Sequence, residues 1–193
     1  MIQKPQGYEN AAVFTDRERL PAGGYLLELI SAEVKAYGWG SVLVIRFDIA
    51  EGPYRGYFAG NYRAQTGEEK RWKGTKRFYL PAGDGSEQDN RDMSILKTAM
   101  EAVEASNPGY KWDWDENSLA GKTVGAVFNN KEYEIGGRRG FYTSCHSFRP
   151  AEAIKSGNFR IPRDSLLKKK ENAPGGCNPD GYEELDTDES LPF

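Results

Sequence analysis

The segment from Val42 to Ile49 constrains the fold most, because it is rich in β-branched residues and its side chains fall into two alternating sets. Successive side chains of a strand point to opposite faces, and β-branched side chains pack well on a pleated surface. One face would carry Val42, Val44, Arg46 and Asp48, and the other Leu43, Ile45, Phe47 and Ile49. We therefore predict a strand whose second, fully apolar set faces the core of a β domain.

The rest of the chain predicts four more strands around this one. A turn at 20–24 precedes a strand from Tyr25 to Lys35, and glycines flank Trp39 at the hairpin tip that follows. After a further turn at 51–53, strands are expected over Tyr54 to Arg63, over Thr123 to Asn129 with a continuation over Tyr133 to Ile135, and over Arg138 to Phe148.

One helix is expected between the third and fourth strands. Apolar residues recur there at Met93, Leu96, Met100 and Val103, which predicts a helix over Arg91 to Ser106 with Asn90 as its N-cap. Residues 64–90 before it are expected to form an extended hairpin insertion. The fold class is mainly β with one clear α-helix. The order β-β-β-α-β-β is that of the OB-fold, a five-stranded Greek-key barrel.

Composition divides the chain into four parts. We expect an N-terminal extension over 1–19, the OB-fold domain over 20–162, a basic linker rich in glycine and proline over 163–177, and a flexible acidic tail over 178–193. The tail holds six acids and no base, which leaves 23 acids and 26 bases elsewhere. The net charge of -3 thus combines a mildly basic body with an acidic tail, a distribution typical of nucleic-acid-binding proteins.

Basic residues and aromatic residues alternate in two segments, 70–79 and 138–142. Proteins that bind single strands use cations along the phosphates and rings that stack on bases, at about 1–3 kcal/mol per base. The candidate DNA-binding residues are Trp39, Tyr57, Arg63, Lys70, Arg71, Trp72, Lys73, Lys76, Arg77, Phe78, Tyr79, Arg138, Arg139, Phe141 and Tyr142. In the alternative interpretation, Trp72 and Phe78 fold into the core and Trp39 caps the barrel. Of the neighbours Tyr57 and Phe58, only one can be exposed on a strand, and we favour Tyr57.

The acids Asp113, Asp115 and Glu116 are the best argument for an enzyme, because clustered carboxylates can hold Mg²⁺ for phosphodiester hydrolysis. They lie in one short loop without a histidine or a second acidic cluster, so we expect no metal, no cofactor and no catalysis. The two cysteines, Cys145 and Cys177, predict neither a disulfide framework nor a zinc site. The chain has no apolar run of membrane-spanning length and no apolar leader, so we expect a cytoplasmic protein without a membrane partner.

The last residues of the chain join acids to an apolar end, and they are the candidate partner-binding residues Asp186, Asp188, Glu189, Leu191, Pro192 and Phe193. This ending resembles the C-terminal tip of bacterial single-stranded DNA-binding proteins. The resemblance implies that the tip recruits other proteins of replication, recombination and repair. The alternative is an ordinary solvated acidic tail.

Four short motifs in the body strengthen the resemblance: Leu20 to Tyr25, Phe47 to Gly52, Glu104 to Tyr110 and Leu119 to Val124. Over about residues 20–165 they are similar to phage- and prophage-encoded single-stranded DNA-binding or recombination accessory proteins of Gram-positive bacteria. The resemblance implies non-enzymatic binding and protection of single-stranded DNA, and it leaves a homo-oligomer open. Two alternatives remain: a metal-dependent nuclease or resolvase of a phage recombination module, and an OB-fold module that binds another polymer, such as an oligosaccharide.

Overall fold

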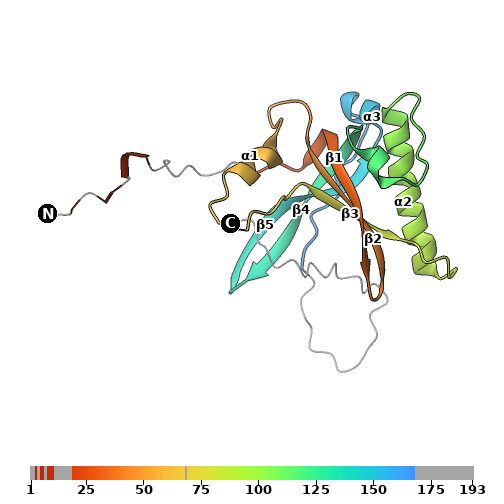
Figure 1. Cartoon of the computed structure of the whole chain (residues 1–193), viewed down its shortest axis with the longest axis horizontal. Coiled ribbons are helices and arrows are strands. Elements are labelled where there is room, and N and C mark those ends of the chain that lie inside the picture. The colour runs from red at the N-terminus through yellow and green to blue at the C-terminus, as the bar shows by residue number, and fades with distance from the viewer. Residues whose placement is uncertain (1–2, 4, 7, 11–18, 68, 168–193) are drawn as a thin grey trace, which may run out of the picture.

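Five antiparallel strands form one sheet in the spatial order β3-β2-β1-β4-β5 (Figure 1). The computed structural model describes residues 3, 5–6, 8–10, 19–67 and 69–167. The strands are β1 Gly23–Tyr37, β2 Gly40–Ile49, β3 Thr75–Leu80, β4 Thr123–Ile135 and β5 Arg138–Arg149. The main helix, α2 Glu87–Ser106, lies between β3 and β4 in the sequence. The prediction of a mainly β chain with one clear helix is confirmed.

Strand β1 is shared between two ladders that occupy different parts of its length. Its first residues, Gly23 to Glu28, pair with β4, whereas Leu27 to Tyr37 pair with β2. The register shifts between Leu29 and Ser31, and such an irregularity increases the local twist. The two edge strands approach each other through side chains, because the ring centroids of Phe78 on β3 and Phe148 on β5 lie 5.4 Å apart. Within the described residues, no ladder joins β3 to β5.

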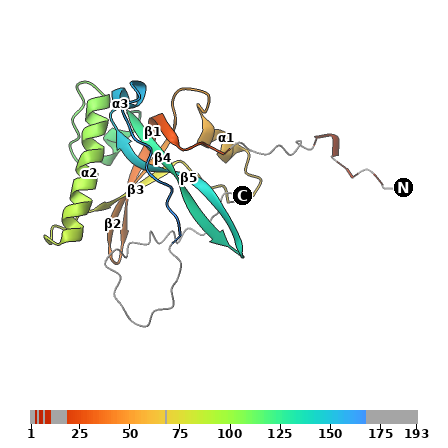
Figure 2. The same cartoon turned by 180° about the vertical axis from the view of Figure 1, so that it is seen from behind.

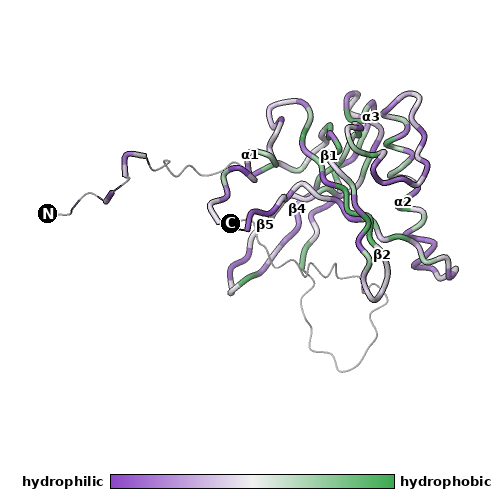
Figure 3. The backbone as a smooth tube through the Cα atoms, in the orientation of Figure 1, coloured by the Kyte–Doolittle hydropathy of each residue, from purple (hydrophilic) through white to green (hydrophobic). Residues whose placement is uncertain are grey.

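The core lies between the concave face of this sheet and α2. The predicted inward set of β2 is buried, with Leu43, Ile45, Phe47 and Ile49 at most 2% exposed. Hydrophobic residues accordingly run along β1 and β2, whereas the outer part of the β4–β5 hairpin is largely hydrophilic (Figure 3). Helix α2 buries Leu96, Met100 and Val103 against the sheet, whereas Met93 of the predicted apolar stripe is 45% exposed.

The predicted third strand, Tyr54 to Arg63, is wrong, because Tyr57–Arg63 forms the helix α1. Gly56 precedes it in the left-handed region with φ of 71°, a conformation that glycine adopts without strain. The carboxylate of Asp48 then accepts hydrogen bonds from the N–H groups of Phe58 (2.9 Å) and Ala59 (3.0 Å). This residue from β2 supplies the cap that the helix start needs. The true third strand, β3, lies inside the predicted insertion at 64–90.

Helix α2 begins earlier than predicted, because its N-cap is Ser86 and not Asn90. The Ser86 hydroxyl accepts from the N–H of Asp89 at 3.1 Å. Strand β4 also runs through the predicted turn at Asn130 without interruption. The short helices η1 Tyr8–Asn10, η2 Glu116–Leu119 and α3 Ala151–Lys155 complete the elements. No helix in the part of the chain that the structure describes is long and apolar enough to cross a bilayer.

The segment after α3 returns to the sheet, although its last residues were predicted to belong to the linker. The N–H of Ser165 donates to the carbonyl of Asn130, and the N–H of Glu132 donates to the carbonyl of Ser165, both at 2.8 Å. The segment therefore pairs with β4 beyond the point where β1 leaves it. The remainder of the predicted linker and the predicted tail, residues 168–193, lie outside the described residues.

Candidate nucleic-acid interface

Three aromatic rings gather at the tip of the β1–β2 hairpin. The rings of Tyr37 and Trp39 are nearly parallel, with centroids 5.1 Å apart and an interplanar angle of 6°. The ring of Tyr79, from β3, lies 5.7 Å from that of Trp39 at 53°. Trp39 is 65% exposed, so it projects outward and is no cap over the core. We call Tyr37, Trp39 and Tyr79 the tip cluster; Tyr37 was not among the predicted site residues.

Charged side chains continue from the tip cluster along the outer face of β1, β2 and β3. The register places Lys35 and Tyr79 beside Val42, and Glu33 and Arg77 beside Val44. Cross-strand partners share one face of a sheet. The Glu33 carboxylate lies 2.8 Å from Arg46 and 3.5 Å from Lys35, so it neutralises part of this row. Lys35 and Arg46 are cations of this face that the sequence patterns did not single out.

A second group lies near α1, at the other end of the β2–β3 ladder. The indole N–H of Trp72 donates to the carbonyls of Phe47 and Gly74, both at 3.1 Å. Its ring tilts at 50° over Tyr62, with centroids 5.7 Å apart. A side chain on Gly74 would collide with the Phe47 carbonyl and the Phe58 ring, so only glycine allows this approach. Phe47 lies six residue steps along β2 from Ser41, which corresponds to about 20 Å.

Cations surround this second group, which we call the Trp72 cluster. The exposed predicted residues are Arg63, Lys70 and Arg71, and Lys73 is half-buried. The Lys70 ammonium donates to the carbonyl of Arg63 at 3.4 Å, and Arg71 lies 3.7 Å from Glu69. Both contacts involve exposed groups, so a phosphate can replace them at little cost.

The third group is the tip of the β4–β5 hairpin. Arg138 and Arg139 are exposed there, and Phe141 is 37% exposed. Arg139 forms a 2.7 Å ion pair with Glu134 on the facing strand, and Tyr142 is half-buried with its ring 6.4 Å from that of Tyr133. Both hairpins extend from the same side of the sheet and diverge toward their tips, as Figures 1 and 2 show from opposite sides.

Three predicted candidates occupy other positions. Phe78 is only 3% exposed and packs on Phe148, so it belongs to the core and is removed from the interface. Tyr57 is half-buried, and its hydroxyl accepts from the N–H of Leu20 at 3.2 Å, because the helix turns it toward the body. Phe58 is buried as predicted. Lys76 lies over the Phe78 ring, 5.7 Å from its centroid, at the approach of β3 to β5.

Positively charged side chains gather near His146 of β5, at the approach of β3 to β5. Burial lowers the pKa of His146, and the neighbouring Lys76, Arg149 and Lys131 lower it further. Burial raises the pKa of Cys145 to about 12, which keeps its thiol protonated. Lys131 and Arg149 were missed by the sequence patterns, because neither lies in a segment where bases and rings alternate.

The acids that were the best argument for a metal site serve the backbone instead. Asp115 is the N-cap of η2, and its carboxylate accepts from the N–H of Asn117 at 3.0 Å. Asp113 accepts from the N–H of Asp115 at 3.3 Å. Among the described residues, no group of three or more His, Cys, Asp and Glu side chains is placed to hold a metal ion.

The predicted partner-binding residues, Asp186 to Phe193, lie outside the described residues. No protein-family model matches the chain, and no curated protein matches it either.

Proposed function

We propose that this protein binds and protects single-stranded DNA without catalysing a reaction. The tip cluster carries this proposal. It presents a largely exposed indole between two further rings, next to a row of cations on the same face of the sheet. Stacking on exposed rings is tolerant of base identity, and cations follow the backbone.

We also propose that the curved sheet is an OB-type barrel. Three features support this: β1 is shared between two ladders, the strand order is β3-β2-β1-β4-β5, and α2 lies between β3 and β4. The last seam, between β3 and β5, is filled by packing of Phe78 on Phe148. OB-type barrels bind oligonucleotides across this sheet face and between the neighbouring loops.

The bound strand would run from the tip cluster along the β2–β3 face to the Trp72 cluster. Arg77 lies on β3 between the two clusters. Arg138 and Arg139 are exposed at the tip of the β4–β5 hairpin and would contact a strand that extends toward that hairpin. A path of about 20 Å between two sets of rings suits a strand held by four to six phosphates, within the usual range of sites on one such barrel.

The acidic tail has two roles in this proposal. Phe193 with its neighbouring acids docks in partner proteins of replication, recombination and repair, in a phage or prophage setting, as the resemblance implies. The six acids of 178–193 also compete with DNA for the cations of the body, because they are tethered at high effective concentration.

The test is fluorescence anisotropy with a labelled poly-dT oligonucleotide across a salt titration. We expect log K to fall with log[salt] at a slope of roughly -3 to -4, as for four to six phosphate contacts to a single strand. The matching duplex should bind much more weakly. A flat salt dependence would refute the proposal and favour an uncharged polymer such as an oligosaccharide. Magnesium-dependent cleavage of the oligonucleotide would favour the nuclease alternative.

A further inference from the structure

A second exposed aromatic site lies in the connection between α2 and β4. The rings of Trp112 and Trp114 are 4.5 Å apart and tilted by 34°. Trp112 packs against the core, whereas Trp114 is 71% exposed, the highest value among the large apolar side chains that the structure describes. The backbone of Trp114 has φ of 71°, a left-handed conformation that is unfavourable for a bulky residue. The chain thus accepts backbone strain to hold this indole outside.

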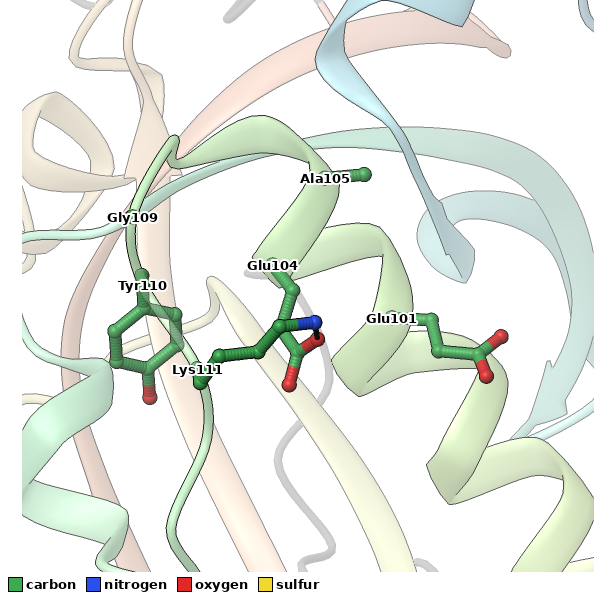
Figure 4. Close-up of a pocket in the computed structure, with 6 residues that line it drawn as sticks. All are labelled: Glu101, Glu104, Ala105, Gly109, Tyr110 and Lys111. Atoms are coloured by element: carbon green, nitrogen blue, oxygen red, sulfur yellow. Dashed lines mark hydrogen bonds and ion pairs between the residues drawn. The ribbon is translucent and has the colours of Figure 1, made fainter.

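The base of this loop is fixed by one carboxylate on α2. Glu104 accepts from the N–H of Trp112 at 3.1 Å and forms a 2.5 Å ion pair with Lys111. Figure 4 shows these two side chains meeting beside Tyr110, over a surface hollow at the end of α2. The Tyr110 hydroxyl in turn contacts Ser118 at 2.7 Å, and Lys122 lies 4.6 Å from its ring centroid. These contacts hold the loop that carries the exposed indole of Trp114 in a fixed position.

Acids outnumber bases around this loop, because Lys111 is paired with Glu104 and Lys122 lies over the Tyr110 ring. Asp113 and Asp115 flank Trp114 in the sequence, and Glu116 follows. In the described part of the chain, no lysine or arginine forms an ion pair with any of the three. Carboxylates without a neutralising cation beside an exposed indole repel phosphates and attract cations, although Asp113 and Asp115 also accept backbone hydrogen bonds.

We propose that the Trp112–Trp114 pair, with Asp113 and Asp115, docks an arginine or lysine side chain presented by a basic segment of a partner protein. A cation over an indole is attracted by the ring quadrupole, and the two carboxylates complement its charge. The loop lies away from both hairpin tips (Figures 1 and 2), so partner and DNA can be bound together. The site does not depend on the proposed function.

The test is a titration of the ¹⁵N-labelled full chain with a peptide of alternating arginine and glycine, followed through the tryptophan indole N–H signals. We expect the signals of Trp112 and Trp114 to shift and saturate, while that of Trp39 stays in place. A peptide with glutamine in place of arginine should shift none of them. Asp113→Asn with Asp115→Asn, which removes charge without removing the rings, should weaken binding about fivefold.

Two variants make this result decisive. Trp114→Ala should abolish the Trp112 shift, whereas Trp39→Ala, which truncates the other strongly exposed indole, should leave it unchanged. A chain lacking residues 178–193 should give the same Trp112 and Trp114 shifts, because the tail's acids do not form this site. Equal binding by the double asparagine variant, absence of saturable shifts, or peptide-independent shifts that grow with protein concentration would overturn the proposal. The last result would make a second copy the occupant.

Discussion

Replacing Trp39 by alanine removes the central ring of the tip cluster and tests the proposed interface most directly. The indole is 65% exposed and lies between the rings of Tyr37 and Tyr79. A base stacked on such a ring contributes about 1–3 kcal/mol, which corresponds to an increase in Kd of about 5- to 150-fold for the variant. Trp39→Phe keeps an aromatic face and should retain most of the affinity.

The fold should survive this change. The ring buries little surface, so its loss removes the packing on two neighbouring rings, about 0.5–1.5 kcal/mol for an aromatic pair. A thermal unfolding curve close to that of the parent protein would show that any loss of affinity arises at the surface. Trp114→Ala, which removes an exposed indole far from the tip cluster, is the matched control and should leave Kd unchanged.

Anisotropy titrations of both variants at two salt concentrations measure the effect. The slope of log K against log[salt] should be the same for Trp39→Ala and the parent, because no phosphate contact is lost. A change in Kd below about twofold, equal losses in Trp39→Ala and Trp114→Ala, or a slope reduced by about one would each refute the stacking role.

Three further predictions follow from the fold and the charge distribution. Asp48→Ala leaves the N–H groups of Phe58 and Ala59 without their acceptor, so chemical denaturation should show a loss of about 2–4 kcal/mol, with Asp48→Asn losing less. Because burial raises the pKa of Cys145 to about 12, its thiol should resist iodoacetamide at pH 8 in the native protein and react after unfolding, as peptide mass spectrometry can verify; native alkylation at that residue would contradict its burial. Deletion of residues 178–193 should tighten DNA binding at low salt, with the gain fading above about 0.2 M; weaker binding after deletion would make the tail ordinary solvated chain.

The elements that followed from sequence are those in which local pattern and tertiary packing agree. The alternation in β2 predicted its buried face correctly, since Leu43, Ile45, Phe47 and Ile49 all face the core. The segment from Tyr57 to Arg63 is rich in aromatic residues, as a strand often is, yet it forms a helix. The carboxylate of Asp48, about ten residues earlier in the chain, caps the start of this helix. A contact between distant residues decides that element, and no local pattern contains it.

The candidate site was predictable in composition but not in arrangement. The sequence identified Trp39 and Tyr79 separately, but only the β2–β3 register brings Tyr79 next to the hairpin tip. The β1–β2 register adds Tyr37, whose ring stacks on Trp39. The β2–β3 register turns Phe78 inward, since neighbours on a strand face opposite sides. Alternating basic and aromatic residues therefore indicate an interface, while the pairing of the strands decides which aromatic rings belong to it.

The shared strand β1 also determines the order in which the chain can fold. Its second half pairs with β2, its immediate neighbour, so that hairpin can form as soon as both strands are available. Its first half pairs with β4, which follows α2 in the sequence, as the pairing of Gly23 with Phe128 shows. This pairing can form only after α2 and β4 have been synthesised. Contacts so distant in sequence are slow to form, because a long loop must close first. In the folded protein, residues Gly23 to Glu28 of β1 pair with β4. During synthesis, this edge of β1 thus has no partner strand until most of the domain has left the ribosome.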